Sequence, residues 1–439
     1  MDRGKSTTHV LIIGAGLGGL SLAIACRREG LKVTILEQSK QMSEIGAGIQ
    51  LPPNATRIMS HYNLLSHLEG QGQAVCYEHY DAKDWKDGTV LQTRPGRDWA
   101  NRWFGFPWYV IHRADYQNVL LDEALRLGAD LRLDQQVERV ECNETEPCAV
   151  FKDGNRLEAD VIVGADGLSS IVRPSILGHR NVSPDDSGDM AYRATITADQ
   201  IQDLPDDVKA FYDKTIARTW WGPNSHAVLY PIRHGTIWNM VLICPDDLPK
   251  DTARAQADIG EMKAKFQGWD PVLRALVTNV QKCDKWRIRT MAELPTWVKG
   301  SVTVLGDACH PTLPYQAQGA AMAVEDGAVL GKLLGMQQHQ RSTEATIPEV
   351  LKLYESLRKT RTTLNVNGAF ENRNLYHMLP EEVVRQRRNE QLAELDWDDF
   401  ESTFPWSWGR LPYLKDLLGV DVVAGAQAAF AAYPHARSS

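Results

Sequence analysis

The chain has 439 residues, of which 43% are hydrophobic and 24% charged, a composition typical of globular proteins whose length predicts two or three domains. Its net charge of −8 argues against a surface for nucleic acid or anionic membranes, and no window approaches ~20 uninterrupted apolar residues, so no transmembrane segment is expected. The seven cysteines are scattered and contain no C-x-x-C pair. This pattern argues against a disulfide framework or a zinc site, and favours a reducing compartment, the cytoplasm.

The first predicted elements form a nucleotide-binding unit. A short apolar strand is followed by Gly14, Gly16 and Gly19, by a helix of small apolar residues, and by a second strand that ends in Glu37. The three glycines permit, in turn, a tight bend, the close approach of a pyrophosphate and the packing of helix on strand. The helix N-terminus offers free N–H groups to phosphates. Glu37 follows the third glycine by 18 residues, where its carboxylate can accept both ribose hydroxyls. We therefore predict a dinucleotide site rather than a chance glycine-rich turn.

Loops and short strands are expected next. The segment IGAGIQLPPNA, residues 45–55, is rich in glycine and proline and predicts a loop that runs past a ligand, with a plain surface loop as the alternative. Residues 74–110 are rich in tryptophan and predict short strands and loops. Arg113 precedes a helix expected to begin at Asp115, and its cation could meet a phosphate or pair with a surface carboxylate.

A second sheet-edge loop follows. Residues 134–160 alternate between apolar and polar positions and predict a β-meander. The next buried strand, residues 160–164, ends at Asp166 and Gly167. Ligands in open α/β sheets bind at the carboxyl ends of strands, so Asp166 could belong to a nucleotide site, or it could only cap a helix.

Residues from about 181 to 280 contain strand-like runs of β-branched and aromatic residues. They predict a mainly antiparallel sheet, with an amphipathic helix over 258–269. Three polar residues here are candidates for substrate chemistry. Arg193 could pair with a substrate carboxylate or phenolate, or form a salt bridge on the sheet surface. His226 and Tyr230 are four residues apart, which places both on one face of a strand. His226 could act as a base or a hydrogen-bond partner, and Tyr230 could bind a substrate oxygen; structural packing is the alternative for both.

A strand–loop–helix pattern typical of the nucleotide-binding unit returns near residue 302. A strand ends at Gly306 and Asp307, an irregular loop with His310 follows, and a helix of small residues opens at Gly319 and Ala320, where its N-terminus can face a ligand. We interpret His310 as loop packing. The segment after about residue 345 is predicted to be helical and contains no motif that we can interpret.

Together GAGLGG with Glu37, GADG at 164–167 and GDACHP at 306–311 resemble, in order and over about residues 8–340, the FAD-dependent group A aromatic hydroxylases, and among these flavoprotein monooxygenases the salicylate hydroxylase-like branch. The resemblance implies roles in FAD binding for eleven positions. They are Gly14, Gly16 and Gly19 at the pyrophosphate, Glu37 at the adenosine ribose, Gly48 and Arg113 beside the flavin, Asp166 and Gly167 in a motif associated with FAD and the nicotinamide coenzyme, Asp307 at the ribityl chain, and Gly319 and Ala320 near the pyrimidine ring.

The resemblance also implies an activity. NADH or NADPH would reduce FAD, and the reduced flavin would use O₂ to hydroxylate a phenolic or aromatic acid, with release of CO₂ in salicylate-type chemistry. The chain has one G-x-G-x-x-G in a strand–helix context, which fits a coenzyme that binds without a domain of its own. One alternative is hydroxylation or epoxidation of a larger aromatic secondary metabolite, which Trp220, Trp221 and Trp238 would suit. An alternative of another class is a flavin-binding sensor or partner protein without oxygenase activity.

The expected architecture is α/β. A Rossmann-like FAD-binding domain is formed by residues 1–73, 101–180 and 283–345, a mainly antiparallel substrate domain by 74–100 and 181–282, and a helical C-terminal region by 346–439. The protein is expected to be a monomer or a homodimer.

Overall fold

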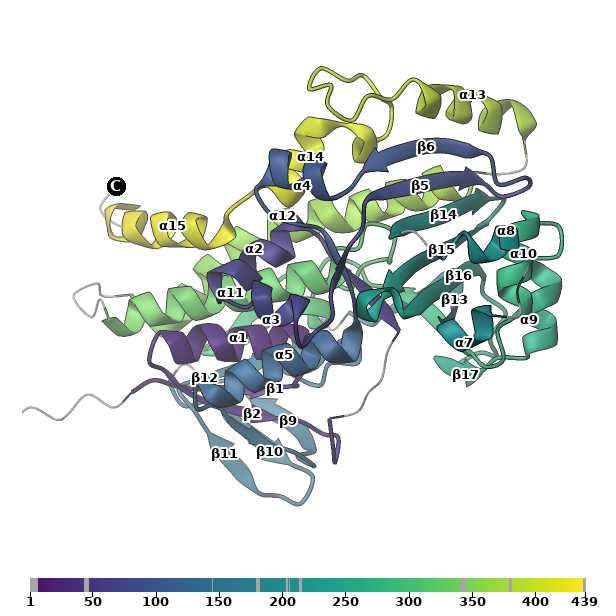
Figure 1. The fold of residues 1–439 in the computed structure, drawn as a ribbon. Helices are drawn as coiled ribbons and strands as arrows, with labels where there is room; N and C mark the ends of the chain where they lie inside the picture. Colours follow the sequence, from purple (N-terminus) through teal and green to yellow (C-terminus); the bar gives the residue numbers. More distant parts are fainter. Residues whose placement is uncertain are drawn as a thin grey trace, which may run out of the picture.

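The structure is a computed structural model that describes residues 7–42, 47–143, 145–178, 182–202, 204, 206–212, 215–339, 345–378 and 381–436. Ile45 and Gly46, the first two residues of the glycine- and proline-rich segment, lie outside these ranges. The architecture is α/β, as predicted, with two main sheets and a helical C-terminal region (Figure 1). No helix of the described residues is long and apolar enough to cross a membrane.

The first sheet has six strands in the order β19-β20-β12-β1-β2-β8. They are β19 (Val298–Lys299), β20 (Val302–Val304), β12 (Val161–Gly164), β1 (His9–Ile13), β2 (Lys32–Leu36) and β8 (Asp130–Arg132), and all pairs except β19–β20 are parallel. Residues of β1 and β12 are buried almost continuously, as in parallel strands that are covered on both faces. The carboxyl ends of β1, β12 and β20 therefore lie side by side and bring the three glycine-containing loops together.

The second sheet has eight strands in the order β17-β18-β13-β16-β15-β14-β5-β6. They are β17 (Arg254–Gln256), β18 (Asp284–Thr290), β13 (Asp185–Thr197), β16 (Ile237–Pro245), β15 (Ser225–Ile232), β14 (Ile216–Gly222), β5 (His79–Asp84) and β6 (Val90–Pro95). Only β14 and β5 pair in parallel; the other neighbours are antiparallel.

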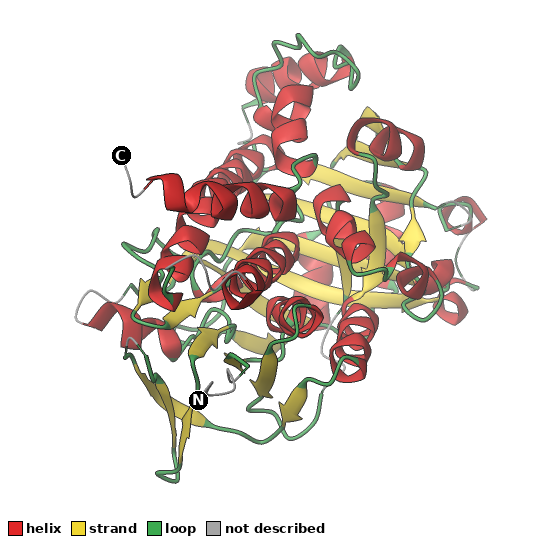
Figure 2. Ribbon diagram, turned by 90° about the vertical axis from the view of Figure 1, so that its left-hand side faces the viewer, coloured by secondary structure: helices red, strands yellow, loops and turns green. Residues whose placement is uncertain are grey.

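Two three-stranded sheets contain the remaining strands of the described residues. The sheet β3-β7-β4, formed by β3 (Gly48–Leu51), β7 (Tyr109–His112) and β4 (Val75–Cys76), contacts β15 and β16 of the larger sheet. The expected meander forms β9 (Val137–Glu141), β10 (Cys148–Phe151) and β11 (Arg156–Glu158), which project at the lower end of the molecule in both views (Figures 1 and 2).

Helices cover both main sheets. They are α1 (Leu17–Arg28), α2 (Pro53–His61), α3 (Leu65–Glu69), α4 (Arg97–Phe104), α5 (Arg113–Arg126), α6 (Val172–Leu177), α7 (Ala198–Ile201), α8 (Asp206–Lys209), α9 (Ile259–Lys265), α10 (Pro271–Thr278), α11 (Gly319–His339), α12 (Ile347–Tyr376), α13 (Glu382–Ala393), α14 (Leu411–Leu418) and α15 (Val422–Ala436). Of these, α1 packs closely on α11, where Gly327 and Gly331 leave no room for a side chain between the two backbones. Three helices of the C-terminal segment, α13 to α15, lie in the upper half of the molecule in the view of Figure 1.

The segment 45–55, expected as a loop, contains β3 and the start of α2, because residues 48–51 pair with β7. The sequence prediction also differs from the structure in two helices. The tryptophan-rich segment contains α4, whose buried Ala100 and Phe104 are four residues apart and face the core together. The helix expected over 258–269 ends earlier, at Lys265, although Asp258 does cap its N-terminus by accepting a hydrogen bond from the Glu261 N–H.

A buried network of charges ties α12 to α11. The Arg358 guanidinium binds Glu325 at 2.8 Å and Asp326 at 2.6 Å, and Arg361 also binds Glu325. Asp326 in turn binds His310 Nε2 at 2.6 Å and accepts a hydrogen bond from the Gly306 N–H at 3.0 Å. Burial raises the pKa of Asp326, but His310 and Arg358 outweigh it and lower the pKa to about 2. The network therefore holds both ends of the loop 306–310 through Asp326, whose carboxylate remains ionised at neutral pH.

We predict that Arg358→Leu is strongly destabilising, because it leaves Glu325 and Asp326 buried without this cation. The expected loss is about 3–5 kcal/mol in the free energy of unfolding, measured by denaturant titration. The matched control is Arg102→Ala, which breaks the exposed pair with Asp398 and should cost less than about 1 kcal/mol. Equal effects of the two substitutions would contradict the structural role of the network.

Candidate active site

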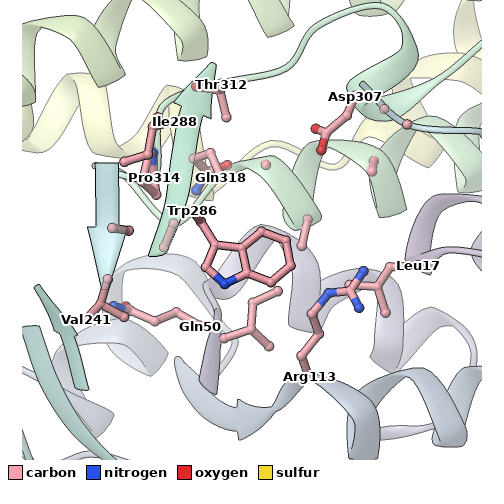
Figure 3. Close-up of a pocket in the computed structure, with 18 of the residues that line it drawn as sticks. Leu17, Gln50, Arg113, Val241, Trp286, Ile288, Asp307, Thr312, Pro314 and Gln318 are labelled. Atoms are coloured by element: carbon pink, nitrogen blue, oxygen red, sulfur yellow. The ribbon is translucent and has the colours of Figure 1, made fainter. Parts of the chain in front are cut away.

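A deep cleft lies between the two main sheets. Two adjoining cavities of about 520 and 940 Å³ form it, and five residues line both of them: Gly16, Arg113, Arg193, Trp286 and Asp307. The indole of Trp286 reaches into the middle of the first cavity, with Arg113 and Asp307 toward one side (Figure 3). Its volume lies within the range of small-molecule sites.

The three glycines of the first loop have different surroundings. Gly14 has a φ of +107°, and a Cβ there would lie 2.4 Å from the Ala165 carbonyl oxygen; a Cβ on Gly19 would lie 2.2 Å from the Gly14 oxygen. A Cβ on Gly16 would meet no protein atom within 4 Å, because Gly16 faces the cleft at the N-terminus of α1. Gly14 and Gly19 thus allow the loop to pack against its neighbours, while Gly16 leaves space for a ligand beside free N–H groups.

Glu37 lies at the end of β2 and faces the same loop. Its Oε2 accepts a hydrogen bond from the Ala15 N–H at 3.0 Å, and its Oε1 accepts one from the Ser39 N–H at 2.9 Å. These bonds fix the carboxylate at the edge of the larger cavity, which it lines. Because each carboxylate oxygen has a second lone pair, Glu37 can still accept hydrogen bonds from a ribose.

Asp307 points into the cleft from the loop after β20 (Figure 3). Its side chain is accessible from the cavity, yet the protein around it raises the pKa of the carboxyl, an effect that His310 and Arg113 oppose. Arg113 begins α5 and faces Asp307 across the cleft, with its own backbone N–H donating to the Ala47 oxygen. The loop conformation depends on the Asp326 network, so the position of Asp307 is set by residues behind it.

Asp166 and Gly167 occupy different positions although they are adjacent. The Oδ2 of Asp166 accepts hydrogen bonds from the N–H groups of Ile171 and Val172 and so caps α6, while its Oδ1 is buried without a partner. Gly167, with a φ of +73°, lines the smaller cavity. The structure therefore places the backbone of this motif at the cleft and turns the Asp166 carboxylate toward the helix.

The register of the larger sheet places one row of side chains across the cavity wall. Arg193 on β13 pairs with Val241 on β16, which pairs with Val228 on β15. In the neighbouring rows, two residues along each strand, the cavity wall includes Ala191, Ile243, His226 and Tyr230, with Trp286 and Ile288 from β18. Side chains two residues apart share a face, so this entire wall follows from the pleat of four strands.

Arg193 and Tyr230 meet at this wall without protein partners for their polar groups. Arg193 makes no hydrogen bond or ion pair with any described residue, and burial lowers the pKa of its guanidinium, an effect that Tyr230 opposes. Burial likewise raises the pKa of the Tyr230 phenol, which the Arg193 charge opposes. Residues that are largely buried and polar without protein partners are suited to bind a ligand.

His226 lies in another row of the same wall. Its Nδ1 is 2.7 Å from the Nε2 of His377, the residue that caps the C-terminus of α12. Burial, together with His377, lowers the pKa of His226 well below its ordinary value, so both the ring and its partner are neutral at pH 7.

The remaining predicted residues also reach the cleft. Gly319 and Ala320, at the start of α11, and Gly48, at the start of β3, line the smaller cavity. A Cβ on Gly48 would lie 2.5 Å from the Tyr230 ring, and its N–H donates to Asn239 at 2.7 Å, which ties the small sheet to the larger one.

The sequence analysis missed Trp286 and Ile288. The alternation of apolar and polar residues in DKWRIRT would place both on one face, but only the pairing of β18 with β13 shows that this face is the cavity wall. Trp220, Trp221 and Trp238 are not at the cavity. They pack against Phe211, Tyr376 and Tyr212, respectively, so they give no support to a broad substrate site.

Comparisons with known proteins agree with this geometry. The model of the family described as FAD binding domain matches residues 7–369. The FAD-dependent monooxygenase OpS4 of Beauveria bassiana is 38% identical over 97% of this chain and 98% of its own. The 3-hydroxybenzoate 6-hydroxylase of Polaromonas naphthalenivorans is 32% identical over 93% of this chain and 99% of its own.

Solved structures show the same fold. A salicylate hydroxylase substrate complex superposes with a TM-score of 0.78 at 23% identity and covers 97% of this chain and 98% of its own. FAD is accordingly the cofactor of this protein, and the open Gly16, the free lone pairs of Glu37 and the cavity-facing Asp307 are compatible with it.

We predict that substitution of Gly16 affects FAD binding, whereas substitution of Gly14 or Gly19 affects the stability of the fold. Gly16→Ala should leave the unfolding free energy of the FAD-free protein unchanged but weaken FAD binding, because the added methyl group enters only the cleft. Gly14→Ala and Gly19→Ala should destabilise the FAD-free protein by about 1–3 kcal/mol or more, because each Cβ collides with backbone. Denaturation of the FAD-free variants and fluorescence titration with FAD are the measurements. A Gly16→Ala protein as unstable as the other two would contradict this division.

Proposed function

This chain belongs to the family of FAD-dependent monooxygenases that carry the FAD-binding domain, and we propose that it hydroxylates the ring of a phenolic or aromatic acid with NAD(P)H and O₂. The observation that carries the substrate class is Arg193, a largely buried cation with no ion pair among the described residues, directed at a cavity with apolar walls. An aromatic ring suits Trp286, Val241 and Ile243, and a carboxylate or phenolate suits Arg193.

The proposed FAD contacts follow the cleft. The N–H groups at the start of α1, beside Gly16, would bind the pyrophosphate, and Glu37 would accept the adenosine ribose. Asp307 would hold the ribityl chain, with Arg113 and Gly48 beside the flavin. The N-terminus of α11, at Gly319 and Ala320, would offer N–H groups to the pyrimidine ring. We assign Gly14, Gly19 and Asp166 to the shape of these loops, and Gly167 to the cleft wall.

The bound FAD supplies hydride acceptance from NAD(P)H and activation of O₂. The protein's own residues orient the substrate and favour its anionic form. Arg193 favours an anionic substrate, and a phenolate ring is far more reactive toward an electrophilic oxygen than a phenol. Tyr230 donates a hydrogen bond to a substrate oxygen, and the apolar residues of the wall exclude water from the reacting atoms.

Observations on the cavity, the cysteines and the sheets support three further parts of the proposal. The larger cavity extends beyond the proposed FAD contacts to Thr195, Arg254 and Asp284 of the second sheet, and this part would provide room for NADH or NADPH. All seven cysteines are free thiols, which favours the cytoplasm as the compartment. The division into an FAD-binding domain and a substrate domain agrees with a cleft that lies between the two main sheets.

A larger aromatic substrate is the second candidate, because the name of OpS4 specifies no substrate. A substrate panel distinguishes the candidates. The purified protein is supplied with NADH or NADPH and with hydroxybenzoates, including 3-hydroxybenzoate and salicylate, or with multi-ring phenols. We expect oxygen consumption and hydroxylated product with a single-ring acid. Turnover of multi-ring phenols alone would support the second candidate, and the absence of ligand-dependent oxygen uptake would support a non-oxygenase flavoprotein.

We predict that Arg193→Ala and Tyr230→Phe retain FAD but lose coupling, so that less product forms per NAD(P)H consumed and more hydrogen peroxide appears. Each removed hydrogen bond to an anionic substrate should raise its dissociation constant about tenfold or more. Arg193→Lys should recover part of the affinity because it restores the charge.

The control for the tyrosine is Tyr212→Phe, since Tyr212 is also buried with an unpartnered hydroxyl but packs against Trp238 away from the cavity. Full coupling in both cavity variants would place Arg193 and Tyr230 outside the substrate site.

A further inference from the structure

His226, at the cavity wall, shares one hydrogen bond with His377, and both rings are neutral. It joins His226 Nδ1 and His377 Nε2 at 2.7 Å, so one of these two nitrogens carries the proton and the other accepts it. The direction of this bond decides whether the other nitrogen of His226 is a donor or an acceptor. The Nε2 of His226 makes no hydrogen bond with any described residue, and His226 lines the cavity.

The surroundings of the second nitrogen of His377 indicate which ring donates the shared hydrogen bond. The Nδ1 of His377 is buried and has no hydrogen-bond partner. If His377 accepted the shared bond, its proton would be on Nδ1, and an N–H group would be buried unpaired. If His377 donates the shared bond, only a lone pair is left unpaired there. Unpaired buried N–H groups are rarer than under-satisfied acceptors, so the second arrangement is favoured.

The charged neighbours allow this arrangement. The rings of Tyr315 and Tyr376 pack around His226, and neither histidine binds a carboxylate among the described residues. Asp189, whose charge acts on His377, is engaged by the Tyr315 hydroxyl at 2.5 Å and by Arg373 at 2.5 and 2.7 Å. A histidine that acts as a base is usually held by an acceptor on its second nitrogen, and no such acceptor is present here among the described residues.

We infer that His377 is a positioning residue that donates to His226 Nδ1 and thereby fixes His226 with its proton on Nε2, as a hydrogen-bond donor for the oxygen of a phenolate bound in the cavity. His226 thus stabilises a substrate that has already lost its proton to solvent water, rather than removing that proton. The inference rests on the proposed function in that the cavity ligand is a phenol; the arrangement of the two histidines does not depend on it.

The tautomers are measured directly by ¹⁵N NMR of the resting holoenzyme labelled in its histidines. We expect both rings to be neutral and protonated on Nε2 at pH 7. His377→Gln assigns the signals, because it removes one ring and shifts the other. A proton on His226 Nδ1, or a cationic ring, would overturn the inference, and this measurement needs no substrate.

The effect on a ligand is measured with 3-hydroxy-4-nitrobenzoate, whose phenolate absorbs visible light. The wild-type protein should lower the pKa of the bound phenol. His377→Gln keeps an N–H donor for His226 and should preserve this shift, whereas His377→Phe keeps a ring but no donor. The phenylalanine variant should raise the dissociation constant of the phenolate about tenfold and bring the phenol pKa back by about one unit.

Tyr376→Phe is the matched control, because it alters a neighbouring buried ring without removing the histidine bond, and it should resemble wild type. Equal binding by the glutamine and phenylalanine variants would overturn the inference, whether both resemble wild type or both are impaired. Failure of the wild-type protein to bind the probe counts against the proposed aromatic-acid substrate, while the NMR result still decides the histidine pair.

Discussion

Arg358 extends from α12 into the core and binds the adjacent carboxylates Glu325 and Asp326 of α11, and the shape of the cleft depends on these bonds. Asp326 holds His310 and the Gly306 N–H, which define the loop that bears Asp307. Each carboxylate would destabilise the fold if it were buried without a partner. The arginine offsets this cost because it lies within hydrogen-bond distance of both. The same bonds that join two helices therefore also fix a side chain of the proposed FAD site.

The long helix α12 links the two halves of the cleft. Near its middle, Arg358 supports the flavin-side loop, and at its end Arg373 binds Asp189 while His377 binds His226. The C-terminal segment contains no recognisable motif, yet it positions groups at both ends of the cavity. A substitution on the inner face of α12 can thus alter the proposed FAD site or the substrate wall without contacting either ligand.

The substrate wall depends on strand pairing. Arg193, His226, Tyr230 and Trp286 come from three strands, and they share one face because β16 lies between β13 and β15 in a fixed register. A shift by one residue would turn each side chain to the opposite face. The tie between Gly48 and Asn239 then sets the distance of this wall from the small sheet beside the proposed flavin position.

The sequence by itself determined the α/β class, the nucleotide unit at Gly14 to Glu37 and the family resemblance, because these depend on local spacing that only a strand–turn–helix satisfies. It also placed His226 and Tyr230 on one strand face, since that follows from the period of the pleat. It left open whether Asp166 faces the cleft or a helix, and it gave no sign that Trp286 reaches the cavity or that His377 binds His226. Those outcomes were decided by tertiary structure, because they depend on contacts between segments such as Trp286 with β13 and His377 with β15, and pairing over such separations leaves no local pattern in the chain.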